Sequence, residues 1–115
     1  MSPKSHKRAR APQPQQAVVF AALGDNTRLA LVARLVSGKP ASIAQLASAS
    51  PLTRQAITKH LRVLERAGVV RSIRSGRESR FVRDPRPLHA MQHYLVRVSR
   101  QWDQALARLK SFVES

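Results

Sequence analysis

The chain has 115 residues, no cysteine and a formal net charge of +15, because 21 lysines and arginines face only 6 acidic residues. Its length fits one domain with a modest core, and the absence of thiols excludes disulfides, thiolate metal sites and thiol redox sensing. A charge excess of this size favours a polyanionic partner, of which nucleic acid is the commonest.

No apolar run approaches the roughly 18 residues that a membrane span needs, and no signal-peptide core is present. An anionic membrane surface is a rival partner for so basic a chain, but the basic residues are not set against a separate lipid-seeking face. We therefore expect a soluble, cytoplasmic protein without a membrane partner.

Residues 1–15 form the first predicted segment, a basic arm. The arm carries Lys4, Lys7, Arg8 and Arg10 among prolines and glutamines, and it has no acidic residue and few apolar ones. Such a composition is typical of a disordered segment. Either the arm lies along DNA phosphates or in a minor groove, or it is a dispensable, solubilising tail.

Residues 16–84 are predicted to form one domain, which opens with two helices. The first is an apolar helix over residues 17–23 that ends at a glycine, and Asp25 is placed to cap the second. The Gly-Lys-Pro sequence at residues 38–40 should stop this second helix. Its expected core-facing residues are Leu29, Leu31, Val32, Leu35 and Val36.

A third, short helix is predicted from a capping box, in which Ser42 and Gln45 stand as Ser-x-x-Gln. This helix should run to about Ser48, and a turn over residues 49–52 separates it from the next one. Two short helices joined by a tight turn are the helix-turn-helix arrangement.

The helix predicted over residues 53–68, TRQAITKHLRVLERAG, has an apolar face and a polar face. Ile57, Leu61 and Leu64 fall at i, i+4 and i+7 and form one stripe that should pack inward. The first residue, a threonine, can cap the helix, and the last, a glycine, can end it in a left-handed conformation. The polar face offers amide, hydroxyl, ammonium and guanidinium groups, which reach base edges and phosphates in a major groove. A solvated surface helix is the plainer interpretation of that face.

A two-stranded hairpin is predicted next, because residues 69–74 and 78–83 carry β-branched or aromatic side chains on both sides of a Ser-Gly turn. The hairpin bears five arginines against one glutamate, and a basic ribbon behind a DNA-reading helix is a wing. Between residues 53 and 83, nine basic residues face two acidic ones. The positive charge is therefore clustered over this helix and hairpin.

Residues 85–115 are predicted to form one long dimerisation helix. Apolar residues recur there at alternating steps of three and four, the pattern of a helix packed lengthwise against others. Three small helices cannot cover a stripe of this length, so a second subunit should bury part of it. The alternative is a monomeric helix lying across its own domain. The seam residues are Leu88, Met91, Leu95, Val98, Trp102, Ala105, Leu109 and Phe112.

Four blocks of sequence follow one another in an informative order. They read LGDNTR from residue 23, SIAQLA from residue 42, AITKHLRVL from residue 56 and AGVV from residue 67. In these blocks the chain resembles the ArsR/SmtB family of winged-helix repressors, over residues 17–84. The Asp84-Pro85 pair and the helix that bears Trp102 resemble the branch of that family without metal-binding cysteines.

The resemblance implies a mainly α-helical winged helix-turn-helix with a small β-hairpin, in a bacterial homodimer that represses by occluding its promoter. By position it assigns base contacts to Arg54, Gln55, Thr58 and Lys59. It assigns backbone contacts to His60, Arg62 and the wing around Arg77. The predicted DNA-binding residues are Ser42, Gln45, Thr53, Arg54, Gln55, Thr58, Lys59, His60, Arg62, Arg74, Arg77 and Arg80. The resemblance also places the first and last helices in the dimer interface, with Phe20, Leu88, Met91, Leu95, Val98, Trp102, Leu109 and Phe112 as the predicted contacts.

Metal sensing, which occurs in this family, has one pair of candidate ligands here. His89 and His93 stand at i, i+4 on the last helix, so both rings can face one ion. Two imidazoles without a neighbouring acid make an incomplete site, although a dimer mate can supply more ligands. We expect no metal and no cofactor, and an inducer of unknown identity stays open.

Enzyme function finds no support, because the few acidic residues are scattered and no phosphate loop or nucleophile elbow is present. The sequence thus predicts a sequence-specific regulator that binds a palindromic operator as a homodimer. A nucleoid-type architectural protein with little sequence preference is the main alternative, since fold and charge suit it too. A protein-interaction module that docks an acidic partner is a third class.

Overall fold

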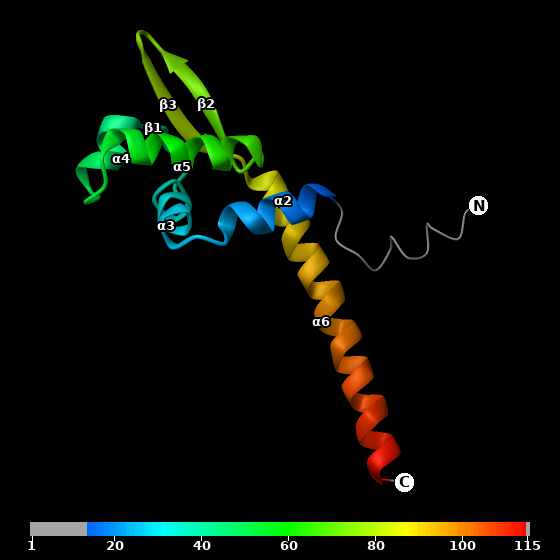
Figure 1. Ribbon diagram of the computed structural model, residues 1–115. Helices are drawn as coiled ribbons and strands as arrows, with labels where there is room; N and C mark the ends of the chain where they lie inside the picture. The colour runs from blue at the N-terminus through cyan, green and yellow to red at the C-terminus, as the bar shows by residue number, and fades with distance from the viewer. Residues whose placement is uncertain (1–13, 115) are drawn as a thin grey trace.

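In the computed structural model, which describes residues 14–114, a small helical domain and sheet sit at one end of a long helix (Figure 1). The principal extents are 66 × 37 × 22 Å. Of the predicted arm, only Pro14 and Gln15 lie within the described residues, and both belong to the first helix. In chain order the elements are α2 (Pro14–Leu23), α3 (Asn26–Arg34), β1 (Ala41–Ser42), α4 (Ile43–Ser48), α5 (Arg54–Arg66), β2 (Val70–Ser75), β3 (Glu78–Arg83) and α6 (Pro85–Glu114).

Side-chain caps begin three of these helices where the sequence predicts them. The Asp25 carboxylate accepts the Arg28 N–H at 3.0 Å, and the Thr53 hydroxyl accepts the Ala56 N–H at 3.1 Å. At the start of α4, Ser42 and its partner make both hydrogen bonds of the predicted capping box. Each cap satisfies a backbone donor that the helix itself cannot pair.

A glycine ends α5, also as predicted. Gly68 has φ +79°, its N–H donates to the Glu65 carbonyl at 2.9 Å, and the Val69 N–H donates to the Leu64 carbonyl at 3.0 Å. This is the Schellman arrangement, which a residue without Cβ adopts most easily. The chain is thereby turned directly from α5 into β2.

The hydrophobic core is built around α5, whose predicted apolar stripe, Ile57, Leu61 and Leu64, is completely buried at 0% exposure. Side chains from the other elements of the domain close around it. The largest of these fully buried side chains are Leu35, Leu46, Val69, Val70 and Phe81. The helix therefore presents only its opposite face to solvent.

The predicted hairpin is present and is extended by a third strand. β2 and β3 pair antiparallel with Ser72 opposite Phe81, and β1 pairs with the other edge of β3 through Ala41 opposite Phe81. The sheet order is β1-β3-β2. A two-residue strand carries no periodicity of its own, so the sequence shows the hairpin and not its extension.

The prediction for α3 is wrong at two of its five core positions. Leu31 and Leu35 are buried and Val32 packs against the core, whereas Leu29 and Val36 are 49% and 65% exposed. Leu29 lies on the side of α3 that faces away from the protomer's own core, and Val36 lies in the turn after the helix, which ends at Arg34.

The long helix is continuous and starts at Pro85, because a proline in the first turn forfeits no hydrogen bond. Met91 is buried and Leu88 packs on the core, so these two predicted interface residues serve their own protomer. Beyond them α6 leaves the domain (Figure 1), and every described side chain from residue 99 onward is exposed. No helix among residues 14–114 is both long and apolar enough to cross a membrane.

Candidate nucleic-acid interface

The outward face of α5 gathers the side chains predicted to read bases. Arg54, Gln55 and Lys59 are exposed, and Thr58 is half-buried between them. They project opposite the buried stripe of the same helix, which anchors the backbone that carries them. Because α5 is fixed along its whole length by core contacts, these groups are presented on a rigid support.

Thr58 is restricted in the hydrogen bonds that it can offer. Its hydroxyl donates to the Arg54 carbonyl four residues earlier, with an oxygen-to-oxygen distance of 2.7 Å. With its proton used, the hydroxyl oxygen can accept but not donate. It is thus suited to a base amino group, and the side-chain methyl is suited to thymine.

Arg62 is held against the wing. Its guanidinium lies 2.8 Å from the Glu65 carboxylate and 5.8 Å above the centre of the Phe81 ring. The other oxygen of Glu65 accepts from the Ser72 hydroxyl at 2.6 Å. The hydrogen bond from Ser72, followed by that from Arg62, holds the pKa of Glu65 below its ordinary value.

Glu65 therefore ties α5 to β2 and also orients a predicted phosphate contact. Sequence reasoning missed this role, although the spacing i, i+3 between Arg62 and Glu65 was a visible signal. The bond to Ser72, seven residues further on, depends on how the hairpin folds back over the helix.

His60 faces the interior side of the recognition helix. Its Nδ1 lies 3.2 Å from an Arg28 guanidinium nitrogen and 3.9 Å from the Asp25 carboxylate. Arg28 also donates from Nε to the Ala22 carbonyl at 2.6 Å. Since a guanidinium can only donate, Nδ1 must accept, which leaves the His60 proton on Nε2.

This cluster connects α5 with the corner between α2 and α3. The backbone N–H of Arg28 is the main cause that lowers the pKa of Asp25, with a smaller contribution from the charge of Arg28. The predicted phosphate contact of His60 can use only its Nε2–H. No sequence signal joins Arg28 to a residue 32 positions away.

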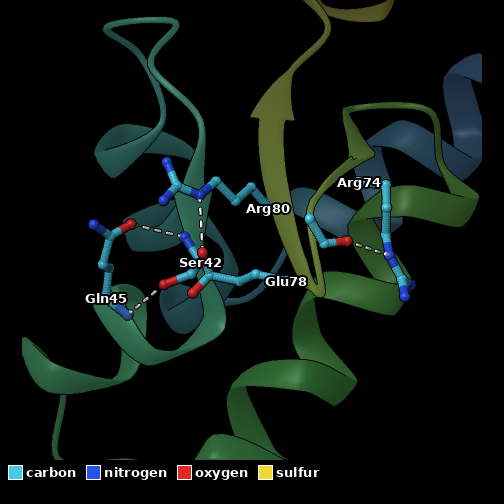
Figure 2. Close-up of polar contacts among 6 residues, drawn as sticks. Ser42, Gln45, Arg74, Glu78 and Arg80 are labelled. Atoms are coloured by element: carbon cyan, nitrogen blue, oxygen red, sulfur yellow. Dashed lines mark hydrogen bonds and ion pairs between the residues drawn. The ribbon is translucent and has the colours of Figure 1, made fainter.

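The two predicted contacts of α4 differ in access. Ser42 is 3% exposed, and its hydroxyl and backbone N–H are both engaged with Gln45, at 3.1 and 2.8 Å (Figure 2). Gln45 is exposed and keeps its side-chain NH₂ group for an outside acceptor. A DNA contact by Ser42 itself remains a prediction, and its observed role is to hold Gln45.

The wing divides its arginines between two sides. Neighbouring residues alternate across a strand, and the register places Arg74 opposite Ser79 but Arg80 opposite Ile73. Figure 2 shows Arg80 near Ser42 on one side of the hairpin and Arg74 on the other. The number of arginines in the hairpin sequence does not reveal this division between its two sides.

Local bonds fix the direction of two wing side chains. Arg80 Nε lies 3.1 Å from the Glu78 carboxylate, and Arg74 Nε donates to the Gly76 carbonyl at 3.2 Å. Arg77 lies in the turn, where it is exposed. The tip of the wing thus presents an arginine, with further arginines on both sides behind it.

An ion pair at the base of the wing supports the start of α6. Asp84 is 7% exposed and accepts from the Arg86 backbone N–H at 3.1 Å and from two guanidinium nitrogens of Arg86 at 3.0 and 2.6 Å. The side-chain bonds, then the backbone bond, lower the pKa of Asp84 to about 2. This pair joins the end of β3 to the start of the long helix.

The two candidate metal ligands do not belong to a larger group of possible ligands among the described residues. His89 and His93 are both exposed on α6. Within residues 14–114 no three histidine, aspartate or glutamate side chains lie close enough together to hold one ion.

Comparison with known proteins supports a regulator. Residues 23–73 match the family model described as a helix-turn-helix domain. The chain is 35% identical over 94 residues to the HTH-type transcriptional regulator Rv2034 of Mycobacterium tuberculosis, which covers 82% of this chain and 84% of that protein.

Solved structures share the fold. An ArsR-like transcriptional regulator from Rhodococcus sp. RHA1 superposes with a TM-score of 0.75 at 38% identity, covering 85% of this chain and 92% of that one. The homodimeric winged helix-turn-helix domain of Mb0332 from Mycobacterium bovis has a TM-score of 0.62 at 18% identity, covering 90% and 92%. This second likeness shows the fold alone.

The two closer likenesses extend over most of the chain, including the recognition helix and the wing. They agree with the expectation of a non-enzymatic, DNA-binding protein. The chain belongs to the ArsR family of helix-turn-helix transcriptional regulators, and it is a member without cysteine.

Proposed function

We propose that this regulator binds a roughly palindromic operator as a homodimer and represses by occluding a promoter. The observation that carries the proposal is the separation of the two faces of α5. One face is locked in the core at 0% exposure, and the other presents Arg54, Gln55 and Lys59 next to a basic wing.

The arrangement divides the contacts by role. Gln55 can read adenine bidentately, and Arg54 can read guanine, because their paired hydrogen-bonding groups match those base edges. Arg62, already held beside the wing, and Arg77 at its tip are suited to phosphates. Phosphate contacts fix the register of the protein on the duplex, while base contacts choose the sequence.

A second copy is needed to cover apolar surface that one protomer leaves in solvent. Helix α2 is apolar on nearly all sides, yet only Val19 and Ala22 are buried, and Val18 is 50% exposed. The outer half of α6 is exposed as well. A helix with apolar residues all round is normally buried, so the predicted interface between first and last helices fits these surfaces.

The residues predicted for that interface fall into two sets. Phe20 packs edge-on against Tyr94, with ring centres 6.2 Å apart, so it joins α2 to α6 within one protomer. Leu95, Trp102, Leu109 and Phe112 are 48–78% exposed. We propose the exposed set as the contacts between protomers. Two-fold symmetry would then place the recognition helices in successive major grooves, about 34–36 Å apart.

Competition binding tests this function against the architectural alternative. The natural probe is the duplex upstream of the protein's own gene, with a scrambled duplex of the same composition as its control. A specific regulator prefers its operator by ~10³-fold or more at physiological salt. Equal affinity for both duplexes would replace the repressor with a nucleoid-type protein.

A second comparison separates DNA binding from an interaction module. Arg54→Ala and Lys59→Ala should weaken duplex binding, because both side chains are exposed on the reading face. If duplex binding stays intact while an acidic partner is lost, the face serves protein recognition. Repression itself is measured with a reporter gene behind the bound promoter, and activation there would contradict it.

A further inference from the structure

The outer half of α6 carries an apolar stripe that its own protomer leaves uncovered. The members recur at steps of four, three and four residues and therefore share one side of the helix. Their exposed fractions lie between 56% and 74%. We call them the α6 stripe: Trp102, Leu106, Leu109 and Val113.

A second uncovered strip lies on α3 and the turn that follows it. Leu29, Ala33 and Val36 recur at steps of four and three residues, and all three are exposed. The other side of α3 is buried in the core and packs against α5. We call these three residues the α3 stripe, and two of them, Leu29 and Val36, are the residues that contradicted the sequence-based core.

One flank of the α6 stripe carries two carboxylates, although residues 99–114 as a whole have three basic side chains and two acidic ones. Four of the six acidic side chains accept a hydrogen bond inside the protomer. The other two, Asp103 and Glu114, have no partner among the described residues, and both lie on α6 beside the stripe. They are eleven residues, about three turns, apart, and with Lys110 between them that flank has a net charge of −1.

We propose that, in the homodimer proposed above, the α6 stripe of each protomer packs on the α3 stripe of the other. This inference rests on the proposed dimer and specifies how its copies touch. A chain of net charge +15 offers a basic surface for the two unpaired carboxylates. Lys39, exposed just beyond the α3 stripe, is a candidate partner.

The length of α6 and its exposed apolar surface suit the α6 helix of a second copy as the partner of the α3 stripe. The exposed part of α6, residues 99–114, is about 24 Å long at 1.5 Å per residue, which is enough to leave one domain and reach another. Six of the seven stripe side chains are leucine, valine or tryptophan and are 49–74% exposed, so they offer apolar area toward the roughly 800 Å² that each partner of a standard interface buries. Pairing of the two α6 helices alone would leave the α3 stripe in water.

The contact would act on the helix that positions the DNA-reading surface. From α3, Arg28 bonds His60 of the recognition helix, and Arg34 donates to the Leu46 carbonyl of α4 at 3.2 Å. A partner's α6 seated on α3 therefore fixes the support of α4 and α5. The spacing of the two recognition helices would be set through this contact.

Disulfide trapping tests the inference cleanly, because the natural chain has no cysteine. Val36→Cys and Leu109→Cys proteins, both altered at exposed positions, are mixed, allowed to exchange subunits and oxidised. We expect a cross-linked heterodimer between the two variants. The matched control is Ser111→Cys with Val36→Cys, since residue 111 lies on the opposite side of α6 and should not cross-link.

Each outcome has a distinct meaning when sedimentation of the unmodified protein is measured alongside. A dimer that cross-links Leu109→Cys only to itself contradicts the docking on α3 and leaves the proposed dimer standing. A monomer at micromolar concentration contradicts the dimer. As an independent check, Val36→Asp should weaken self-association at least tenfold without unfolding the protomer, and unchanged self-association would overturn the inference.

Discussion

Helix α5 and the outer half of α6 are both amphipathic, but they differ in what covers their apolar sides. In α5 the apolar stripe is completely buried by the same chain, whereas in α6 Trp102 and Val113 remain 65% and 74% exposed. The apolar side of the first helix is covered by its own protomer, and that of the second is left exposed for the partner proposed above. The comparison shows that an apolar seam in a sequence predicts burial, but does not say whether the same protomer or a partner covers it.

The largest difference between these regions should appear in stability. Leu61→Ala removes a side chain at 0% exposure and should cost about 2–5 kcal/mol of unfolding free energy at any protein concentration. Leu109→Ala should instead lower stability by an amount that depends on concentration, because its contacts in the proposed dimer lie between protomers. Denaturant unfolding at several protein concentrations checks both variants. If the two losses of stability depended on protein concentration to the same extent, α5 and α6 would not differ in what covers them.

Trp102 gives a direct view of the second region, since it is the single tryptophan of the chain. If the partner buries it, its emission should shift to the red on dilution as the dimer dissociates. Trp102→Ala should weaken self-association by about 2 kcal/mol or more, as central aromatic contacts do. Emission that stays red at every concentration would show that this tryptophan is never covered.

Within the DNA-reading region, base contacts and backbone contacts can be told apart. Gln55→Ala should reduce discrimination between operator and scrambled duplex by ~1–3 kcal/mol per lost base contact. Binding to the scrambled duplex is the internal control and should change little. Unaltered discrimination would mean that α5 does not read bases through this side chain.

Arg77→Ala should have a smaller and more uniform effect. Loss of one phosphate contact weakens binding to all sequences and flattens the salt dependence of affinity by about one unit of slope. Titrations at several salt concentrations measure the slope. A selective loss on the operator alone would assign Arg77 to base or groove recognition.

The smallest expected effect concerns the junction between the two regions. Because the pKa of Asp84 in the folded protein is about 2, below its ordinary 3.8, its ion pair stabilises the fold above pH 3.8. This contribution is lost as the pH falls through 2. Between pH 5 and 2 the natural protein should therefore lose more stability than Asp84→Asn, and parallel curves would show that the pair contributes nothing.

Much of the fold and part of the site could be predicted from local pattern. The caps at Asp25, Ser42 and Thr53 and the glycine end of α5 depend on groups a few residues apart, so the sequence displays them directly. The exposed polar surface of α5, which we propose reads bases, follows from helical periodicity in the same way. The pairing of Glu65 with Ser72 and of His60 with Arg28 brings together separate elements, and no local spacing reveals it.

The amino-acid sequence by itself determined the order of the helices, the two faces of α5 and the clustering of positive charge, because each follows from short-range geometry and composition. Only the tertiary structure decided that Leu29 and Val36 face outward, that His60 turns toward Arg28 and that the wing arginines lie on two sides. These side-chain positions depend on which elements pack together and on which surfaces that packing leaves exposed. Helical periodicity determines which residues share a face of a helix, and long-range packing determines which other element covers that face.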